Sequence, residues 1–281
     1  MKVVLLGTGT PRQDTDRWGP ASAVVVNGNA YIVDCGPGVV RRAAGAYEKG
    51  VEELRPNKLR YLFVTHLHSD HTIGYPDIIL SPWVVGRKEP LEAFGPTGLD
   101  AMTQNLLAAY KEDIDLRIDG LEHGNSTGYH VNVHEIKPGV VYQEGNLTVK
   151  AFYVKHGSWK EAFGYRFETP ERTVVFSGDT CPCDELIREA QDVDVLVHEV
   201  YEEAAAVPEN RPGGDEWPKY MHAFHTSTME LGRIAAQCKP KLLVLYHVLR
   251  RKTTPDRTLI EEIRKGGFKG RVVVGKDLQT Y

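Results

Sequence analysis

The chain has 281 residues, of which 41% are hydrophobic and 26% are charged, and it carries a net charge of −4. Without a net basic charge it has no general attraction for nucleic acid, and its apolar runs are far shorter than the ~20 residues that a membrane span needs. Its four cysteines are too few for a disulfide framework, so we expect reduced thiols and a cytoplasmic location.

Short β-rich runs alternate with helical patterns along the chain. Runs that carry Val, Tyr or Phe and are bounded by Gly, Pro, Asn or Asp predict strands. These strands are Val3–Leu6, Ala23–Val26, Tyr31–Val33, Tyr61–Val64, Leu147–Tyr153, Thr173–Phe176, Val193–Val197, Leu242–Tyr246 and Val272–Val274. The predicted helices are Leu99–Tyr110, Asp184–Ala190, Thr228–Gln237 and Asp256–Lys265. Ser227 followed by Glu230 predicts a capping box at the start of the third helix.

No low-complexity linker and no repeat of fixed period divides the chain, so we expect a single domain over residues 1–281. The segment Ala204–Pro218 is rich in proline and glycine, and it is expected to form a surface loop. The alternation of elements predicts a layered α/β or α+β domain with mixed sheets.

The densest chemical signal follows the predicted strand Tyr61–Val64, where His66, His68, Asp70 and His71 fall within six residues. In an extended segment His66 and His68 point to the same side, because side chains alternate with a period of two. Imidazole and carboxylate ligands suit zinc and related divalent metals. Four ligands from one short loop exceed what one small cation readily takes, so the motif favours two adjacent metal ions.

Other predicted strands also lead into titratable side chains. His156 follows the strand that ends at Tyr153, Asp179 comes after the flexible Gly178, and His247 follows the last long strand. The pair His198–Glu199 follows a fourth strand. The two oxygens of the Asp179 carboxylate could bridge two cations, so these positions are candidates to complete a two-metal site.

These motifs, in this order, resemble the metal-binding motifs of the metallo-β-lactamase superfamily over essentially the whole chain. Further segments resemble the ribonuclease Z branch of that superfamily, which also includes arylsulfatases and other phosphodiesterases. They are Gly7–Pro11, Asp34–Gly38, Glu92–Pro96, His198–Glu199 and His225–Thr228, where Thr226 departs from the usual His-Ser-Thr pattern.

The resemblance implies an α/β fold of the αββα sandwich type, with two mixed β-sheets flanked by helices. It also implies two divalent metal ions, with zinc as the default and Mn²⁺ or Fe²⁺ as alternatives. The first ion would take His66, His68 and His156, the second would take Asp70, His71 and His247, and Asp179 would bridge them. Asp34 would hold one ligand histidine in its tautomer.

The same resemblance implies a hydrolase that uses a metal-bridging hydroxide to attack an ester, most simply a phosphodiester. Asp70 would orient the hydroxide and receive its proton. His225 would protonate the departing alkoxide, and Glu199 would orient His225. A sulfate-ester, carboxyl-ester or lactone hydrolase on the same site is the alternative enzyme, and a non-catalytic metal- or nucleic-acid-binding module is the alternative from another class.

One departure bears on the substrate. Ribonuclease Z proteins carry a long arm that grips tRNA between the positions matched by His156 and Asp179, and here these lie only 23 residues apart (179 − 156). We therefore expect a small-molecule ester substrate, with nucleic acid less favoured and no membrane partner. A homodimer is left open. The basic stretch Arg250–Lys276 predicts either a solvated surface helix or an anion-attracting rim.

The remaining candidates are assigned structural roles. His198 is either a packing residue or a residue that contacts a metal ligand. His222 is expected at the surface. His123, His130 and His134 are not expected to be ligands. Cys181 and Cys183 are expected to be structural.

Overall fold

The computed structural model describes all 281 residues, and the chain divides into two compact units. Unit 1 comprises residues 1–136 and 276–281, and unit 2 comprises residues 137–275. The last residues of the chain thus return to unit 1, where Val3 and Tyr281 exchange two backbone hydrogen bonds of 3.0 and 2.8 Å. No helix of either unit is long and apolar enough to cross a membrane.

Unit 1 contains a six-stranded mixed sheet in the order β1-β2-β3-β4-β5-β6. The strands are β1 (Lys2–Gly7), β2 (Ala21–Val26), β3 (Asn29–Val33), β4 (Tyr61–Phe63), β5 (Leu91–Gly95) and β6 (Val131–Glu135). The first three pair antiparallel and the last four pair parallel. Asn27 and Gly28 join β2 to β3 with φ of 54° and 76°, the left-handed pair typical of a tight hairpin turn.

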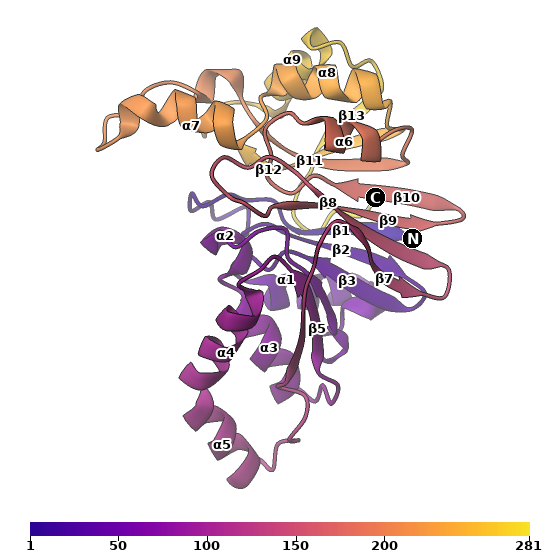
Figure 1. Ribbon diagram of the computed structural model, residues 1–281, viewed down its shortest axis with the longest axis vertical. Coiled ribbons are helices and arrows are strands. Elements are labelled where there is room, and N and C mark those ends of the chain that lie inside the picture. Colours follow the sequence, from indigo (N-terminus) through magenta and orange to yellow (C-terminus); the bar gives the residue numbers. More distant parts are fainter. The chain divides into compact units, whose positions relative to one another are not determined.

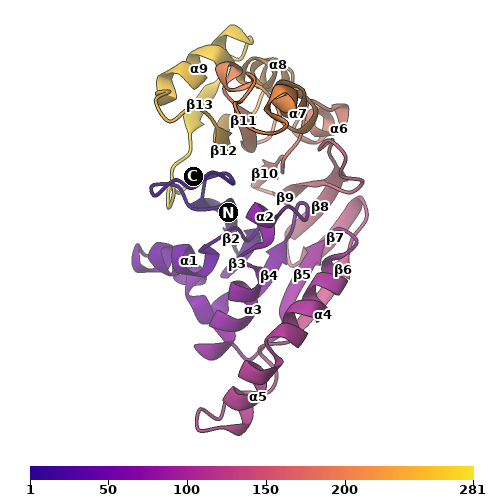
Figure 2. The same ribbon diagram turned by 90° about the vertical axis from the view of Figure 1, so that its left-hand side faces the viewer.

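The helices of unit 1 are α1 (Val39–Glu48), α2 (Ser69–Thr72), α3 (Tyr75–Val84), α4 (Leu99–Ala109) and α5 (Lys111–Asp119). Val39 and Ala43 of α1, Ile78 of α3 and Leu99 of α4 join one apolar core with alternate residues of the strands. Figure 2 shows α1 and α3 beside the strands, while α5 lies at the end of the unit away from them.

Unit 2 contains a seven-stranded mixed sheet in the order β13-β12-β11-β10-β9-β8-β7. Its strands are β7 (Gly139–Glu144), β8 (Leu147–Tyr153), β9 (Phe163–Thr169), β10 (Arg172–Phe176), β11 (Val195–Tyr201), β12 (Leu242–Leu249) and β13 (Arg271–Val274). Strands β7 to β10 pair antiparallel and β10 to β13 pair parallel. The loops that carry His156 and Asp179 follow β8 and β10.

The helices of unit 2 are α6 (Asp184–Glu189), α7 (Trp217–Phe224), α8 (Thr228–Cys238) and α9 (Asp256–Lys265). Figure 1 shows α6, α8 and α9 on one side of the sheet, with α7 extending away from them. Leu231 of α8 and Ile263 of α9 are fully buried in the core of this face. The capping box at Ser227 and Glu230 is present, as predicted.

The predicted class, two mixed sheets flanked by helices, is confirmed. Each predicted strand and helix is present, with bounds that differ by a few residues. Several elements were not predicted, and they are α1, α2, α3, α5, α7, β5, β6, β7 and β9. The segment Ala204–Pro218 is irregular apart from two 3-10 turns, Glu203–Ala205 and Gly214–Glu216, and the first two residues of α7.

Candidate metal centre

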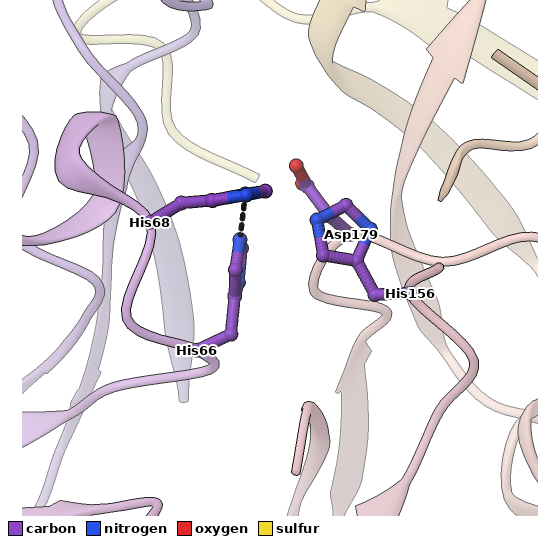
Figure 3. Close-up of side chains that lie close together, drawn as sticks. All are labelled: His66, His68, His156 and Asp179. Atoms are coloured by element: carbon purple, nitrogen blue, oxygen red, sulfur yellow. Dashed lines mark hydrogen bonds between the residues drawn. The ribbon is translucent and has the colours of Figure 1, made fainter. Parts of the chain in front are cut away.

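His66 and His68 follow β4 in an extended segment and approach each other, as their spacing predicts. Nε2 of His66 lies 3.0 Å from Nδ1 of His68, a contact drawn as a dashed line in Figure 3. The His66 side chain is fully buried. Two nitrogens bound to one zinc ion at about 2.0–2.1 Å would be separated by a similar distance. A cation can therefore replace the proton that these two rings share.

The Asp34 carboxylate holds residues of the unit 1 site in place through hydrogen bonds. Its Oδ1 accepts a 2.8 Å hydrogen bond from the backbone N–H of Thr65, and its Oδ2 accepts bonds from the Thr65 hydroxyl at 2.9 Å and from Nδ1 of His71 at 2.8 Å. The structure thus places Asp34 against a ligand candidate, as the sequence analysis expects. Asp34 has a φ of 59°, a conformation that non-glycine residues adopt only where the surroundings hold it.

These hydrogen bonds fix the tautomers of two imidazoles. The Thr65 hydroxyl donates its only proton to Asp34, so it accepts from Nδ1 of His66 at 2.9 Å. His71 likewise donates from Nδ1 to Asp34. Both rings therefore carry the lone pair on Nε2, which is the form that binds a cation. The sequence analysis missed Thr65, because a threonine at the end of a strand carries no distinctive signal.

Asp70 lies near the start of α2, and its Oδ2 is 3.6 Å from Nε2 of His71. The side chain is 11% exposed, unlike the fully buried His71. It lines a cavity of about 640 Å³ within unit 1 that also contains Arg12, Arg17 and Trp18. The Asp70 carboxylate is therefore accessible from a cavity whose lining also includes two arginine side chains.

His156 of unit 2 lies in the loop after β8 and is fully buried. Its Nδ1 donates a 2.7 Å hydrogen bond to the backbone carbonyl of Phe224, the last residue of α7. This bond again leaves the lone pair on Nε2. A carbonyl group is common to all residues, so the sequence could not identify Phe224 as the partner.

Asp179 follows β10 through Gly178, whose φ of 60° makes the turn. Its Oδ2 lies 3.5 Å from Nε2 of His247 and 3.9 Å from Nδ1 of His225. Candidate ligand atoms of these three residues all lie within 4.8 Å of one another. Figure 3 draws the Asp179 carboxylate and the His156 ring of unit 2 as sticks. Within unit 2, His225 is thus near enough to compete as a ligand.

His247 does not follow a strand, so the predicted end of that strand at Tyr246 is wrong. Strand β12 continues to Leu249, and the pairing steps from Glu199–Tyr246 to Val200–Val248. His247 is the extra residue of this β-bulge and has a φ of 44°. Bulges redirect a side chain out of the regular alternation, which explains how a residue inside a buried strand faces Asp179.

His225 and Glu199 form a buried pair. Nδ1 of His225 lies 3.3 Å from Oε1 of Glu199, which also accepts bonds from the backbone N–H groups of Thr180 at 3.2 Å and Thr226 at 3.1 Å. Burial raises the pKa of Glu199, and the adjacent His225 opposes that rise. The arrangement can orient an imidazole and exchange a proton with it.

His198 and Glu199 lie inside β11 rather than beyond its end, which corrects their predicted position. Nδ1 of His198 donates to the backbone carbonyl of Glu199 at 2.5 Å, and burial lowers the pKa of His198 to about 4. His198 is therefore a neutral packing residue at pH 7.

The remaining histidines lie outside the candidate metal centre, and His222 is at the surface, as predicted. His222 is exposed on α7 and contacts the hydroxyl of Tyr201 at 2.8 Å, while His134 pairs with Glu92 at 2.9 Å. None of His123, His130 and His134 belongs to a group that could hold a metal.

The basic stretch Arg250–Lys276 is partly neutralised by its own contacts. Arg250 pairs with Asp256, Arg251 pairs with the buried Glu202, and Arg257 pairs with Glu261. Arg264 donates to two backbone carbonyl groups. These contacts agree with the prediction of a solvated surface helix. Because several of the basic side chains are already paired, fewer of them are left to attract an anion.

The predicted ligands thus form two sets. Unit 1 supplies His66, His68, Asp70 and His71, and unit 2 supplies His156, Asp179 and His247. Each set combines imidazole nitrogens with a carboxylate and includes no cysteine. This donor chemistry fits zinc and other divalent cations.

Comparison with known proteins extends over both units. The sequence model of the β-lactamase superfamily domain matches residues 29–248. Ribonuclease Z of Mycobacterium bovis (strain BCG / Pasteur 1173P2) is 31% identical over 284 aligned residues, which cover 99% of this chain and 96% of that protein. Ribonuclease Z of Mycobacterium sp. (strain KMS) is 34% identical over 254 residues, or 89% of this chain and 84% of that protein.

Solved structures show the same fold. The metallo-β-lactamase fold protein YhfI from Bacillus subtilis matches all of this chain and 98% of its own, with a TM-score of 0.74 and 19% identity. The short form of human tRNase Z also matches all of this chain and 98% of its own, with a TM-score of 0.72 and 21% identity. These matches confirm the predicted metallo-β-lactamase fold.

Proposed function

Because the chain belongs to the ribonuclease Z family of the β-lactamase superfamily, we propose that it hydrolyses phosphodiester bonds in RNA. Members of this family are metal-dependent phosphodiesterases, and we propose that this chain uses two bound zinc ions. We further propose that both units act as one catalytic domain, since the superfamily match runs from residue 29 to residue 248 and includes parts of each.

The proposed metal ligands are His66, His68, Asp70, His71, His156, Asp179 and His247. The observation that carries this assignment is the shared tautomer of His66, His71 and His156, each of which donates from Nδ1 to a fixed partner and directs the Nε2 lone pair to a cation. Mn²⁺ and Fe²⁺ remain alternatives to zinc. When bound, two such ions lower the pKa of a water molecule and neutralise charge on the phosphate oxygens.

The chain's own side chains would handle the protons. Asp70 is partly exposed and lines a cavity, so its carboxylate can orient an attacking water molecule and accept its proton. His225 would donate a proton to the departing oxygen, and Glu199 would hold the His225 ring in place from 3.3 Å. Burial excludes bulk water from both His225 and Glu199, which strengthens their interaction.

The substrate proposal differs from the small-molecule ester expected from the sequence. That expectation relied on the short separation in sequence between His156 and Asp179 and on the net charge of −4. The M. bovis relative, whose name describes a ribonuclease, matches over 96% of its length, so it is hardly longer than this chain. Chain length therefore does not separate this protein from a ribonuclease, and RNA becomes the favoured substrate.

Small phosphodiesters remain usable as minimal substrates, because the chemical step is the same. Sulfate esters and lactones stay as alternative substrates on the same ligands. We also propose a cytoplasmic location, which the free thiols of all four cysteines support. A homodimer stays an open prediction.

The direct test compares substrates on the purified, zinc-loaded protein. An RNA with a single-stranded 3′ trailer, bis(p-nitrophenyl) phosphate, an aryl sulfate and a lactone would be offered in parallel. We expect cleavage of both phosphodiesters, loss of activity with a chelator and recovery with zinc. Turnover of the sulfate or the lactone alone would refute the proposal.

A further inference from the structure

The C-terminal residues of the chain pack against unit 1 and reach the loop that follows β1. Strand β1 lies at one edge of its sheet, and residues 278–281 run antiparallel along that edge. Backbone hydrogen bonds of 2.6–3.0 Å join this segment to Val3 and Leu5. Asp277, which directly precedes the segment, is therefore held at the end of β1, where the chain enters the loop of residues 8–20.

The Asp277 carboxylate accepts hydrogen bonds from two distant positions in this loop. Its Oδ1 accepts from the backbone N–H of Thr8 at 2.9 Å and from the Thr8 hydroxyl at 2.7 Å. Its Oδ2 accepts from the backbone N–H of Trp18 at 2.9 Å and lies 3.7 Å from a guanidinium nitrogen of Arg42. The Asp277 side chain is only 6% exposed, and an ionised acceptor makes stronger bonds than a neutral one. These contacts therefore hold the two ends of the loop together.

Thr8 extends this constraint to Arg17. The Thr8 hydroxyl donates its only proton to Asp277, so it accepts the 2.9 Å hydrogen bond from Nη1 of Arg17. Thr8 is fully buried, and a guanidinium group is planar, so one fixed N–H restricts the orientation of the whole group. Arg17 in turn lines the cavity of about 640 Å³ that Asp70 also lines.

The backbone of the loop is closely packed at the same place. The N–H of Gly9 donates to the carbonyl of Trp18 at 2.7 Å. A Cβ atom at position 9 would lie 2.7 Å from the carbonyl oxygens of Arg17 and Trp18, so only glycine fits there. The glycine-rich motif of residues 7–11 thus lets the loop close tightly, and Asp277 fastens the closed loop to the C-terminal segment.

We propose that Asp277 is a positioning residue: through Thr8 it holds the Arg17 guanidinium at the cavity beside Asp70, where Arg17 would contact the negative charge of the substrate. This inference rests on the proposed phosphodiesterase function and adds to it a residue from the opposite end of the chain. Asp277 does not line the cavity, and its contacts are with Thr8, Trp18 and Arg42 rather than with a proposed metal ligand. Its loss should therefore weaken substrate binding and leave the metal site intact.

The test uses single substitutions with matched controls. Asp277→Asn keeps the size of the side chain, but its N–H₂ group cannot accept a hydrogen bond, so the bonds from Thr8 and Trp18 cannot all form. Thr8→Val keeps the shape of threonine without the hydroxyl, and Thr8→Ser keeps the hydroxyl. Thr280→Val is the control, because Thr280 is an exposed threonine of the same C-terminal segment. Each zinc-loaded protein would be assayed with bis(p-nitrophenyl) phosphate and for inhibition by inorganic phosphate.

We expect KM for the diester and the inhibition constant of phosphate to rise about 5- to 50-fold in Asp277→Asn and Thr8→Val. The value of kcat should change less than about threefold, because a contact made equally to substrate and transition state affects KM alone. Thr8→Ser and Thr280→Val should stay within about twofold of the wild type, and metal content should be unchanged in all four variants. A fall in kcat with unchanged KM, or equal effects of Thr8→Val and Thr8→Ser, would overturn the inference.

A double-mutant cycle shows whether Asp277 acts through Arg17. Arg17→Gln alone should raise KM at least as much as Asp277→Asn does. Adding Asp277→Asn to Arg17→Gln should then raise KM by less than about a further twofold, because the group that Asp277 positions is already absent. Effects that multiply in full would show that Asp277 acts independently of Arg17, and they would overturn the inference.

Limited proteolysis separates this inference from the proposed function. Trypsin cleaves after arginine, and Arg12 is an exposed residue of the loop, so mass spectrometry can follow cleavage at that position. Cleavage there should be about 3- to 30-fold faster in Asp277→Asn than in the wild type and Thr280→Val. If the wild type hydrolysed no phosphodiester, the proposed function would fail, and faster cleavage in Asp277→Asn would still support its hold on the loop. Equal cleavage of all three proteins would overturn the inference.

Discussion

Asp34 accepts a 2.8 Å hydrogen bond from His71 while it adopts a left-handed backbone conformation with a φ of 59°. Such a conformation costs of order 1–3 kcal/mol for a non-glycine residue, so it persists only where neighbouring contacts hold it. Here the backbone and hydroxyl groups of Thr65 hold the same carboxylate. These three hydrogen bonds link the segment after β4 to α2, so the positions of His66 and His71 are fixed relative to each other.

Asp34→Asn should weaken metal binding about 10- to 100-fold, because an amide is a poorer acceptor and its N–H₂ group competes for the same partners. Asparagine tolerates the left-handed conformation, so the fold should remain intact. Zinc affinity would be measured by competition with a chromophoric chelator. Asp119→Asn, an exposed acid on α5, is the control, and an equal loss in both variants would count against the role of Asp34.

The candidate ligands could be picked out from the sequence, because residue type and short spacing indicate their chemistry. His66, His68, Asp70 and His71 fall within six positions, and few structural roles need so many titratable groups there. The tautomers of these imidazole rings could not be predicted from the sequence. These depend on Thr65 and on the carbonyl of Phe224, which lies 68 positions from His156 and becomes its partner only in the folded chain.

The β-bulge at His247 is a second feature that could not be predicted from the sequence. The apolar run ends at Tyr246, so periodicity predicts the end of the strand there. The strand continues because β12 pairs with β11 on both sides of His247, and this register is a property of two strands rather than one. The helix α7 was missed for another reason, since its first two residues lie within the segment Ala204–Pro218, which is rich in proline and glycine.

His225→Ala should slow alkyl phosphodiesters by about 10²- to 10⁴-fold, the usual value of general acid catalysis. It should barely affect p-nitrophenyl esters, because p-nitrophenolate departs without a proton. Steady-state kinetics on both ester types would measure this difference, with His222→Ala on α7 as the control. Loss of bound metal in His225→Ala would instead make His225 a ligand, which its 3.9 Å distance from Asp179 allows.

Glu202→Gln should lower the free energy of unfolding by about 1–3 kcal/mol at pH 7. Burial alone would raise the pKa of the Glu202 carboxyl, but hydrogen bonds from Thr254 and Arg251 outweigh it and lower the pKa below 4.5. This stabilisation is fully present above pH 4.5 and is lost as the pH falls through the lower folded-state pKa.

Urea unfolding of the wild type and Glu202→Gln at pH 7 and pH 4 would measure that effect. The difference between the two proteins should shrink at the lower pH. Glu168→Gln, an exposed residue on β9, should change little at either pH. A difference that is independent of pH would show that the charge of Glu202 is not what stabilises this contact.

We propose that seven residues would hold two metal ions for phosphodiester hydrolysis, and that both ions would depend on Asp179. The most direct measurement is elemental analysis of the purified protein together with its turnover of bis(p-nitrophenyl) phosphate. We predict close to two zinc equivalents per chain in the wild type, and loss of metal and of activity together in Asp179→Ala. One tightly bound ion per chain with full turnover, or full activity in Asp179→Ala, would contradict the account.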